Sequence, residues 1–173
     1  MKKIFQLLSL ITIITFQTNL YAEVPYFIDF KYILNQSDAG KKAQQALKNK
    51  LDNGIKKIQA KEKSIQEEEK KIIAQKKIIS PEEYKKKVDE LRNKVSNLQK
   101  ERNKLLNDVS KQRTKARNEL LKNLNPIIRD YMKQKQIRMV IDKKNLLVAE
   151  DSLDITKDIM ALLNNKLKSI KLN

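Results

Sequence analysis

The apolar residues between positions 41 and 122 recur at helical spacing in two successive stretches. In the first stretch an apolar residue returns every seven positions, at Leu51, Ile58, Ile65, Ile72 and Ile79. A coiled coil needs a second apolar stripe beside the first, but charged residues occupy most of its places: Glu62, Glu69 and Lys76. We therefore predict a long helix whose packing seam is thin.

The second stretch alternates steps of four and three, which is typical of a helix with one buried stripe. Its apolar positions are Tyr84, Val88, Leu91, Val95, Leu98, Leu105, Val109 and Ala116. Between the stretches, Ser80 can cap a helix that starts at Pro81, with Glu83 at the capping-box spacing. Since Pro81 disfavours helical geometry just before it, the connection is short. We predict an antiparallel hairpin of two helices of about 40 residues, roughly 60 Å long.

Short apolar runs flank the hairpin on both sides. Residues 24–30 are rich in aromatic and β-branched side chains, which predicts a strand. Pro126 breaks or kinks the second helix, with a short continuation to about Gln136. The apolar runs 137–142 and 146–149 surround a polar turn and predict a β-hairpin.

The order of elements is therefore a strand, a long helical hairpin, two strands and a final helix capped by Asp154. This order predicts a mainly α fold with a small β body, in the α+β class. The helical hairpin arm covers 41–124 with its tip near 76–87, and the body comprises 23–40 and 125–173. Three short strands and one helix bury too little surface to be stable alone. We expect the body to oligomerise and to share its sheet between subunits.

The N-terminus has the pattern of a secretory signal peptide. Two lysines precede an apolar run at 4–16, and the first acidic residue is Glu23. We predict a signal peptide over 1–22, with cleavage after Ala22 and export of the mature chain. The alternative is an uncleaved membrane anchor, but the run is short against a span of about 20 apolar residues.

The charge of the chain is concentrated on the predicted arm. The full sequence has 38 Lys and Arg against 21 Asp and Glu, and residues 41–122 hold 25 of the basic and 12 of the acidic ones. This balance has three interpretations: a solvated helix face, attraction of acidic unfolded chains, or nucleic-acid binding. Because Lys outnumbers Arg 32 to 6 and the chain is predicted to be exported, we expect no nucleic acid as a partner.

Catalysis finds no support in the sequence. There is no His or Cys, no Gly-rich phosphate loop, and no carboxylate cluster beside a partner base. We therefore expect no enzymatic activity, no catalytic or metal site and no cofactor.

Two groups of residues are candidates for binding. Five lysines cluster at the predicted tip, where anionic lipid or lipopolysaccharide is a plausible partner: Lys76, Lys77, Lys85, Lys86 and Lys87. Four apolar residues fall off the main seam and could contact apolar client segments, although incidental packing explains each equally well: Ile55, Ile73, Ile78 and Leu106.

Several segments together resemble the Skp/OmpH family of periplasmic chaperones. The opening matches at Phe27-Ile28-Asp29-Phe30 and at Ala39-Gly40-Lys41-Lys42-Ala43, and Ser80-Pro81-Glu82-Glu83-Tyr84 lies where the family turns at its arm tip. The closing segment matches at Met139-Val140-Ile141-Asp142-Lys143-Lys144-Asn145. The resemblance covers residues 24 to 165, and the order and spacing of the motifs carry it.

This resemblance implies a homotrimer with a β-barrel body and three helical arms around a cavity. It also implies an ATP-independent periplasmic holdase that binds unfolded outer-membrane β-barrel proteins. The alternative is a structural or adaptor coiled-coil protein of the envelope, which uses the same hairpin for one specific partner or for an anionic membrane surface. A thin seam favours the holdase, because scattered apolar contacts on a flexible arm suit many different clients.

Overall fold

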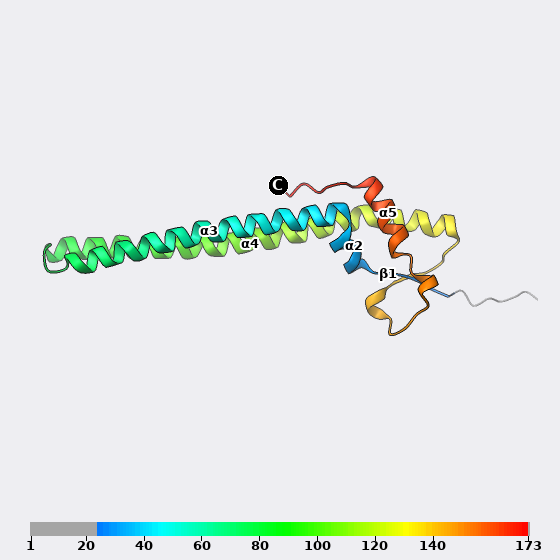
Figure 1. Ribbon diagram of the computed structural model, residues 1–173, viewed down its shortest axis with the longest axis horizontal. Coiled ribbons are helices and arrows are strands. Elements are labelled where there is room, and N and C mark those ends of the chain that lie inside the picture. The colour runs from blue at the N-terminus through cyan, green and yellow to red at the C-terminus, as the bar shows by residue number, and fades with distance from the viewer. Residues whose placement is uncertain (1–23, 173) are drawn as a thin grey trace, which may run out of the picture.

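A computed structural model of the chain describes residues 24–172. The fold is mainly helical, with few strands (Figure 1). Helix α3 (Asp38–Gln75) and helix α4 (Pro81–Lys135) run side by side as a long hairpin, and the remaining elements gather at one end. The predicted signal peptide and its cleavage site lie outside the described residues.

The turn between the two long helices follows from local capping chemistry. Helix α3 ends at Gln75, and Ser80 then caps α4 by accepting a hydrogen bond from the Glu83 backbone N–H at 3.2 Å. Pro81 occupies the first position of the helix, where its missing N–H is not needed. The chain therefore reverses within a few residues, as the sequence predicts.

The segment before the hairpin contains a helix that sequence patterns did not predict. The expected strand over 24–30 is shorter, β1 (Tyr26–Ile28), and Asp29 caps helix α2 (Phe30–Gln36) by accepting from the Tyr32 N–H at 2.7 Å. Ser37 then caps α3 through the Gly40 N–H at 3.2 Å. Two successive caps thus turn the chain twice before the arm begins.

The predicted β-hairpin after the arm is wrong. Only β2 (Val140–Asp142) forms, and it pairs in parallel with β1, with Phe27 opposite Ile141. A short 3₁₀ turn, η1 (Lys143–Asn145), follows, and 146–149 form no strand. Pairing with a strand more than a hundred residues away satisfies the backbone of β2 in place of a local turn partner.

Of the break or kink predicted at Pro126, the break does not occur, whereas the predicted continuation to about Gln136 is confirmed. Helix α4 continues through Pro126 to Lys135, and Gln136 ends it in the left-handed conformation with φ 57°. Leu124 and Ile127 on either side of the proline are both buried in the core. This packing holds the backbone helical where local preference alone would interrupt it.

The final helix crosses the base of the hairpin. After a short 3₁₀ turn, η2 (Asp151–Leu153), helix α5 (Thr156–Lys166) begins. Asp154 accepts from the Thr156 N–H at 2.8 Å, which confirms its predicted capping role. The Thr156 hydroxyl in turn accepts a bond from the Asp29 N–H at 2.8 Å, so this cap also ties α5 to α2.

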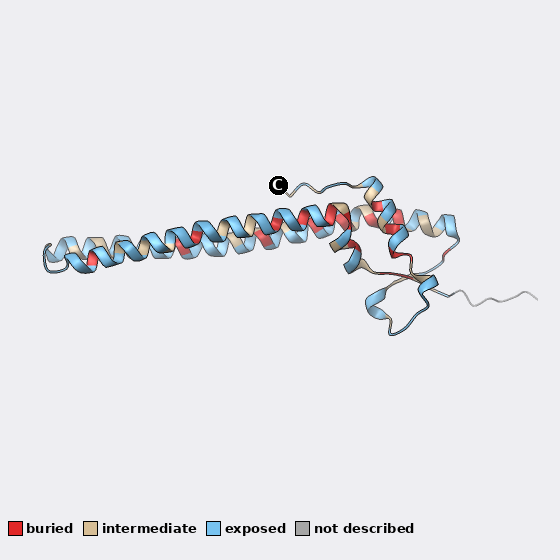
Figure 2. Ribbon diagram, viewed as in Figure 1, coloured by how far each residue is buried: buried red, intermediate tan, exposed pale blue. Residues whose placement is uncertain are grey.

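The hydrophobic core lies at the base, where α2, α4 and α5 meet (Figure 2). Its completely buried members include Ile28, Ile33, Leu124, Ile159 and Leu163. Along the arm, buried residues are few and widely spaced. Within residues 24–172, no helix combines the length and apolarity that a membrane span requires. The base therefore anchors an arm that has little core of its own.

Candidate functional site

The seam of the arm is as thin as the heptad pattern predicts. Among its apolar residues, Ile58, Ile72, Leu98 and Val109 are buried. Val95 was expected in the seam but is 51% exposed. The two helices consequently have little apolar contact over a long distance.

Ion pairs bridge the two helices in the middle of the arm. Lys61 contacts Glu101 and Lys94 contacts Glu68, each at 2.6 Å, and Arg102 pairs with Glu62. All six side chains keep a third or more of their surface exposed, so water and salt screen each pair. Weak, screened contacts thus help to hold the helices together, and Glu62, which interrupts the apolar stripe, makes one of them.

A glycine allows the helices to approach closely nearer the base. A Cβ added at Gly54 would lie 2.5 Å from both terminal methyl carbons of Leu105. Ile55 and Leu106 flank this crossing and help to line a groove of about 250 Å³. Gly54 therefore makes room for Leu105 and leaves its two apolar neighbours facing outward.

The four apolar candidates predicted to lie off the seam are all exposed. The exposed fraction is 40% for Ile55 and 54% for Leu106, and it rises to 59% for Ile73 and 82% for Ile78. The structure brings Ile55 and Leu106 together in one groove, whereas Ile73 and Ile78 lie towards the tip. These side chains are accessible to a partner along the whole arm.

The five tip lysines differ in their surroundings. Lys76 lies over the ring of Tyr84 at 5.9 Å, and Lys87 donates to the Gln75 side chain at 2.8 Å and contacts Glu83 at 3.4 Å. Within the described part of the chain, the other three are exposed and have no ion pair: Lys77, Lys85 and Lys86. Three of the five are thus fully available for binding.

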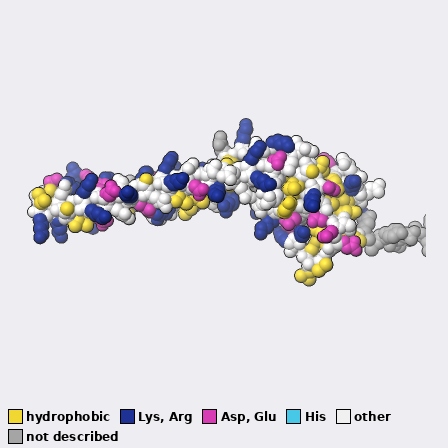
Figure 3. All heavy atoms as spheres, viewed as in Figure 1, with side chains coloured by type: hydrophobic (Ala, Val, Ile, Leu, Met, Phe, Trp, Pro, Cys, Tyr) yellow, Lys and Arg dark blue, Asp and Glu magenta, His cyan; other side chains and the backbone are white. Residues whose placement is uncertain are grey.

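The structure also exposes an apolar loop that sequence reasoning did not single out. Leu147 and Val148 are 103% and 90% exposed, and Met139 lies exposed just before β2. An apolar patch is visible at the lower edge of the body (Figure 3). The signal in the sequence was the apolar run at 146–149, which was interpreted as a strand.

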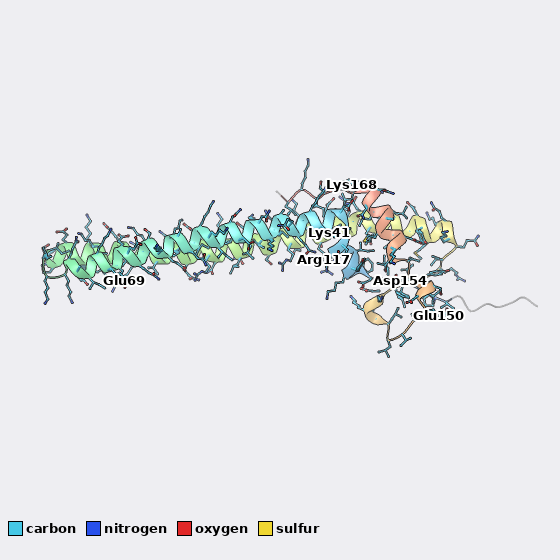
Figure 4. All side chains as sticks on the ribbon, in the orientation of Figure 1. Lys41, Glu69, Arg117, Glu150, Asp154 and Lys168 are labelled. Carbon is cyan, nitrogen blue, oxygen red and sulfur yellow. The ribbon has the colours of Figure 1, made fainter. Side chains whose placement is uncertain are left out.

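A larger groove lies where the arm joins the body, and we name it the base groove. Its floor is lined by apolar residues from α3 and α4: Ala43, Leu47, Ala116 and Leu120. Its rim holds four cations: Lys41, Lys48, Arg113 and Arg117. Figure 4 labels Lys41 and Arg117, which lie at the base of the arm. The groove has a volume of about 870 Å³, and no acidic side chain lines it.

Comparison with known proteins identifies the family. The chain matches the family described as outer membrane protein (OmpH-like) over residues 26–163. It belongs to the OmpH-like family. The resemblance that the sequence motifs indicated is therefore confirmed.

The OmpH-like fold is shared with a solved structure. A crystal structure from Caulobacter crescentus, whose description proposes an OmpH-like outer membrane chaperone, superposes with a TM-score of 0.79. The two chains are 19% identical, and the match covers 86% of this chain and 89% of the other. No curated protein matches this OmpH-like chain. The similarity establishes a common fold.

The arm of this OmpH-like chain presents exposed lysines and exposed apolar side chains. Within residues 24–172, no cluster of three or more Asp and Glu side chains could hold a metal ion. A hydrogen bond to Asp158, helped by burial, raises the pKa of Tyr131 to about 12. That tyrosine lies at the base of the molecule and ties α4 to α5.

Proposed function

We propose that this protein is an ATP-independent periplasmic holdase that captures unfolded outer-membrane β-barrel proteins and prevents their aggregation. The observation that carries the proposal is the arm itself: a long, thin-seamed, basic hairpin with exposed apolar side chains at intervals along its length. Family membership and the fold shared with the Caulobacter protein, itself described as an outer membrane chaperone candidate, support it.

The mechanism combines long-range attraction with weak local contacts. Without Lys2 and Lys3 of the proposed signal peptide, the chain has 36 basic and 21 acidic residues, a net charge of +15. This charge raises the encounter rate with acidic unfolded chains, because opposite charges steer diffusion at low ionic strength. Exposed residues such as Ile55, Ile73, Ile78 and Leu106 then contact apolar client segments. Each contact is weak, so the client can dissociate without nucleotide hydrolysis. Folding of the client away from the arm then makes its release irreversible.

The proposed assembly is a homotrimer whose bodies share a β-barrel and whose three arms enclose the client. Support comes from the small size of the sheet, which has two strands, β1 and β2. Such a sheet is too small to be stable by itself. The exposed Leu147 and Val148 beside it are the surface that assembly would cover. We propose that the chain reaches the periplasm through the signal peptide at 1–22, cleaved after Ala22.

The tip lysines support a second, auxiliary contact with anionic lipid or lipopolysaccharide. Lys77, Lys85 and Lys86 repel one another without an ion-pair partner in the described residues, so the cluster does not serve to stabilise the turn. Replacing these three by Gln should weaken binding to anionic vesicles at low salt. Unchanged binding would contradict the lipid contact.

An aggregation assay tests the chaperone proposal. An unfolded β-barrel membrane protein is diluted from denaturant with stoichiometric amounts of the mature protein and without ATP, and light scattering is followed. We expect the protein to suppress the rise in light scattering. Higher salt should slow capture of the client and so make the suppression less complete. Uninhibited aggregation at low salt would contradict the holdase and favour the adaptor alternative, in which the hairpin serves one specific partner.

A further inference from the structure

The base groove combines unpaired cations with an apolar floor. In the middle of the arm, three cations instead pair with acidic residues of the opposite helix. The four cations on the rim of the base groove have no ion pair within the described residues: Lys41, Lys48, Arg113 and Arg117. Unpaired cations around one groove without an acidic neighbour create a local attraction for carboxylates.

The two arginines set the spacing of the anions that fit. Arg113 and Arg117 are four residues apart on α4, which places them one above the other, about 6 Å apart at about 1.5 Å per residue. Side chains on one face of an extended peptide recur every two residues, or about 6.8 Å. An arginine also binds a carboxylate through two parallel hydrogen bonds, which lysine cannot do. The pair therefore matches carboxylates at alternate positions of an extended chain.

The shape of the groove favours a peptide over a lipid chain. Its floor residues Ala43, Leu47, Ala116 and Leu120 are each at most 5% exposed, so packed side chains close the groove from below. The groove therefore has a closed, apolar floor, and no acyl chain can pass between these packed side chains. An extended segment can place alternate side chains towards the arginines and the intervening ones on the apolar floor.

We propose that the base groove binds an extended unfolded segment in which acidic residues alternate with apolar ones, with successive carboxylates held by Arg113 and Arg117. This inference rests on the proposed chaperone function and names the part of a client that the arm base selects. The groove provides a pattern-selective contact, in contrast to the scattered apolar contacts farther along the arm.

Peptide binding to the full mature protein tests this site. The probe is a fluorescent peptide of about ten residues in which Glu alternates with Val, and the control peptide has the same composition with its Glu residues grouped at one end. Fluorescence anisotropy should show tighter binding of the alternating peptide to the unaltered protein. Equal binding of the two peptides would contradict the inferred spacing.

Two matched variants separate the groove from general charge. Arg113→Gln with Arg117→Gln should weaken binding of the alternating peptide by roughly tenfold, as expected for loss of bidentate pairs. Lys70→Gln with Lys71→Gln removes the same charge from exposed positions farther along the arm and should change it less than about twofold because of screening. Equal losses in both variants, or no loss in the arginine variant, would overturn the proposal.

Further controls distinguish the source of the anion and the function being tested. If the arginine variant loses binding to phosphatidylglycerol vesicles but retains the peptide, the site is a lipid site and the proposal is wrong. If that variant fails to fold by circular dichroism, Lys41→Gln with Lys48→Gln takes its place, and unchanged peptide affinity then counts against the groove. If the unaltered protein fails to suppress aggregation, the proposed function is wrong. If it suppresses aggregation but the arginine variant binds the peptide as tightly as the unaltered protein does, only this inference is wrong.

Discussion

At the scale of single residues, this protein depends on a few close approaches at the base. A Cβ at Gly40 would collide with the backbone carbonyl of Leu34, and it would press on the Ser37 hydroxyl that caps α3. Gly54 makes a comparable approach to the side chain of Leu105. A side chain can rotate away from a new methyl group, but a backbone carbonyl in a helix cannot, so Gly40 is the stricter position.

Gly40→Ala should destabilise the protein by about 1–3 kcal/mol through overpacking against α2. Helix propensity alone predicts the opposite sign, because Ala is better than Gly by about 1 kcal/mol inside a helix. Urea denaturation measures the difference. Ala46→Gly, at an exposed position of the same helix, reports the propensity term alone. A more stable Gly40→Ala protein would contradict the close approach.

Tyr131 gives the stability of the base a dependence on alkaline pH. Its hydroxyl donates to Asp158 at 2.6 Å, and this bond, with burial and the carboxylate charge, raises its pKa from 10.0 to about 12. Because the folded pKa exceeds the unfolded one, the neutral hydroxyl stabilises the fold fully below pH 10.0. That contribution is lost as pH rises from 10.0 through about 12.

Comparison of Tyr131→Phe with the unaltered protein isolates this effect from the titration of the lysines. The free energy of unfolding of the unaltered protein should exceed that of the variant at neutral pH, and the difference should shrink towards zero above pH 10. Tyrosinate absorbance of the folded protein should show one group titrating late. A constant difference across this pH range would exclude the hydrogen bond as its source.

At the scale of elements, ion pairs connect the two long helices at positions where a coiled coil would have apolar contacts. The pairs Lys61–Glu101, Lys94–Glu68 and Arg102–Glu62 span the middle of the arm. Exposed pairs contribute about 0.2–1 kcal/mol each and weaken with salt. The stability of the middle of the arm should therefore depend on salt concentration.

Replacing the three bridging glutamates by Gln should loosen the middle of the arm. Loss of three weak pairs is expected to speed amide hydrogen exchange over about 58–105 by roughly five- to tenfold, while the base core keeps its protection. The altered residues are Glu62, Glu68 and Glu101.

A matched control removes the same charge from the same arm. It replaces three exposed acidic residues that do not bridge the helices: Glu67, Glu69 and Glu90. Exchange in the middle of the arm should then remain close to that of the unaltered protein. Equal acceleration in both variants would show that net charge, and not the bridging pairs, sets the stability of the arm.

At the scale of the whole molecule, an extended arm is attached to a body with a small core and an exposed apolar loop. Leu147 and Val148 extend into solvent beside the two-stranded sheet. Exposed apolar groups of this kind beside unpaired strand edges are typical of surfaces that another chain covers. The body of the single chain therefore leaves an apolar surface uncovered.

Leu147→Glu with Val148→Glu should abolish self-association if assembly covers this loop. Sedimentation of the mature protein should give three times the mass of one chain, and the variant should sediment as a single chain because buried charges oppose assembly. Ile78→Glu, an exposed residue at the tip, is the matched control and should leave the mass unchanged. A monomeric unaltered protein would contradict the proposed trimer.

Local sequence determined the arm. Seven-residue spacing, the cap at Ser80, the position of Pro81 and the charge of the helices all act over a few residues, so pattern alone predicted the hairpin and its thin seam. The exposure of the four off-seam apolar residues followed from the same periodicity. These features need no knowledge of distant parts of the chain.

Tertiary structure decided the base. The parallel pairing of β1 with β2 joins segments more than a hundred residues apart in sequence. The continuity of α4 through Pro126 and the base groove also depend on packing between different elements. Core packing around Leu124 and Ile127 outweighed the local preference of proline. The physical reason is that burial of apolar surface stabilises the base only when distant segments pack together. The spacing of residues within one segment does not indicate which distant segment it will contact.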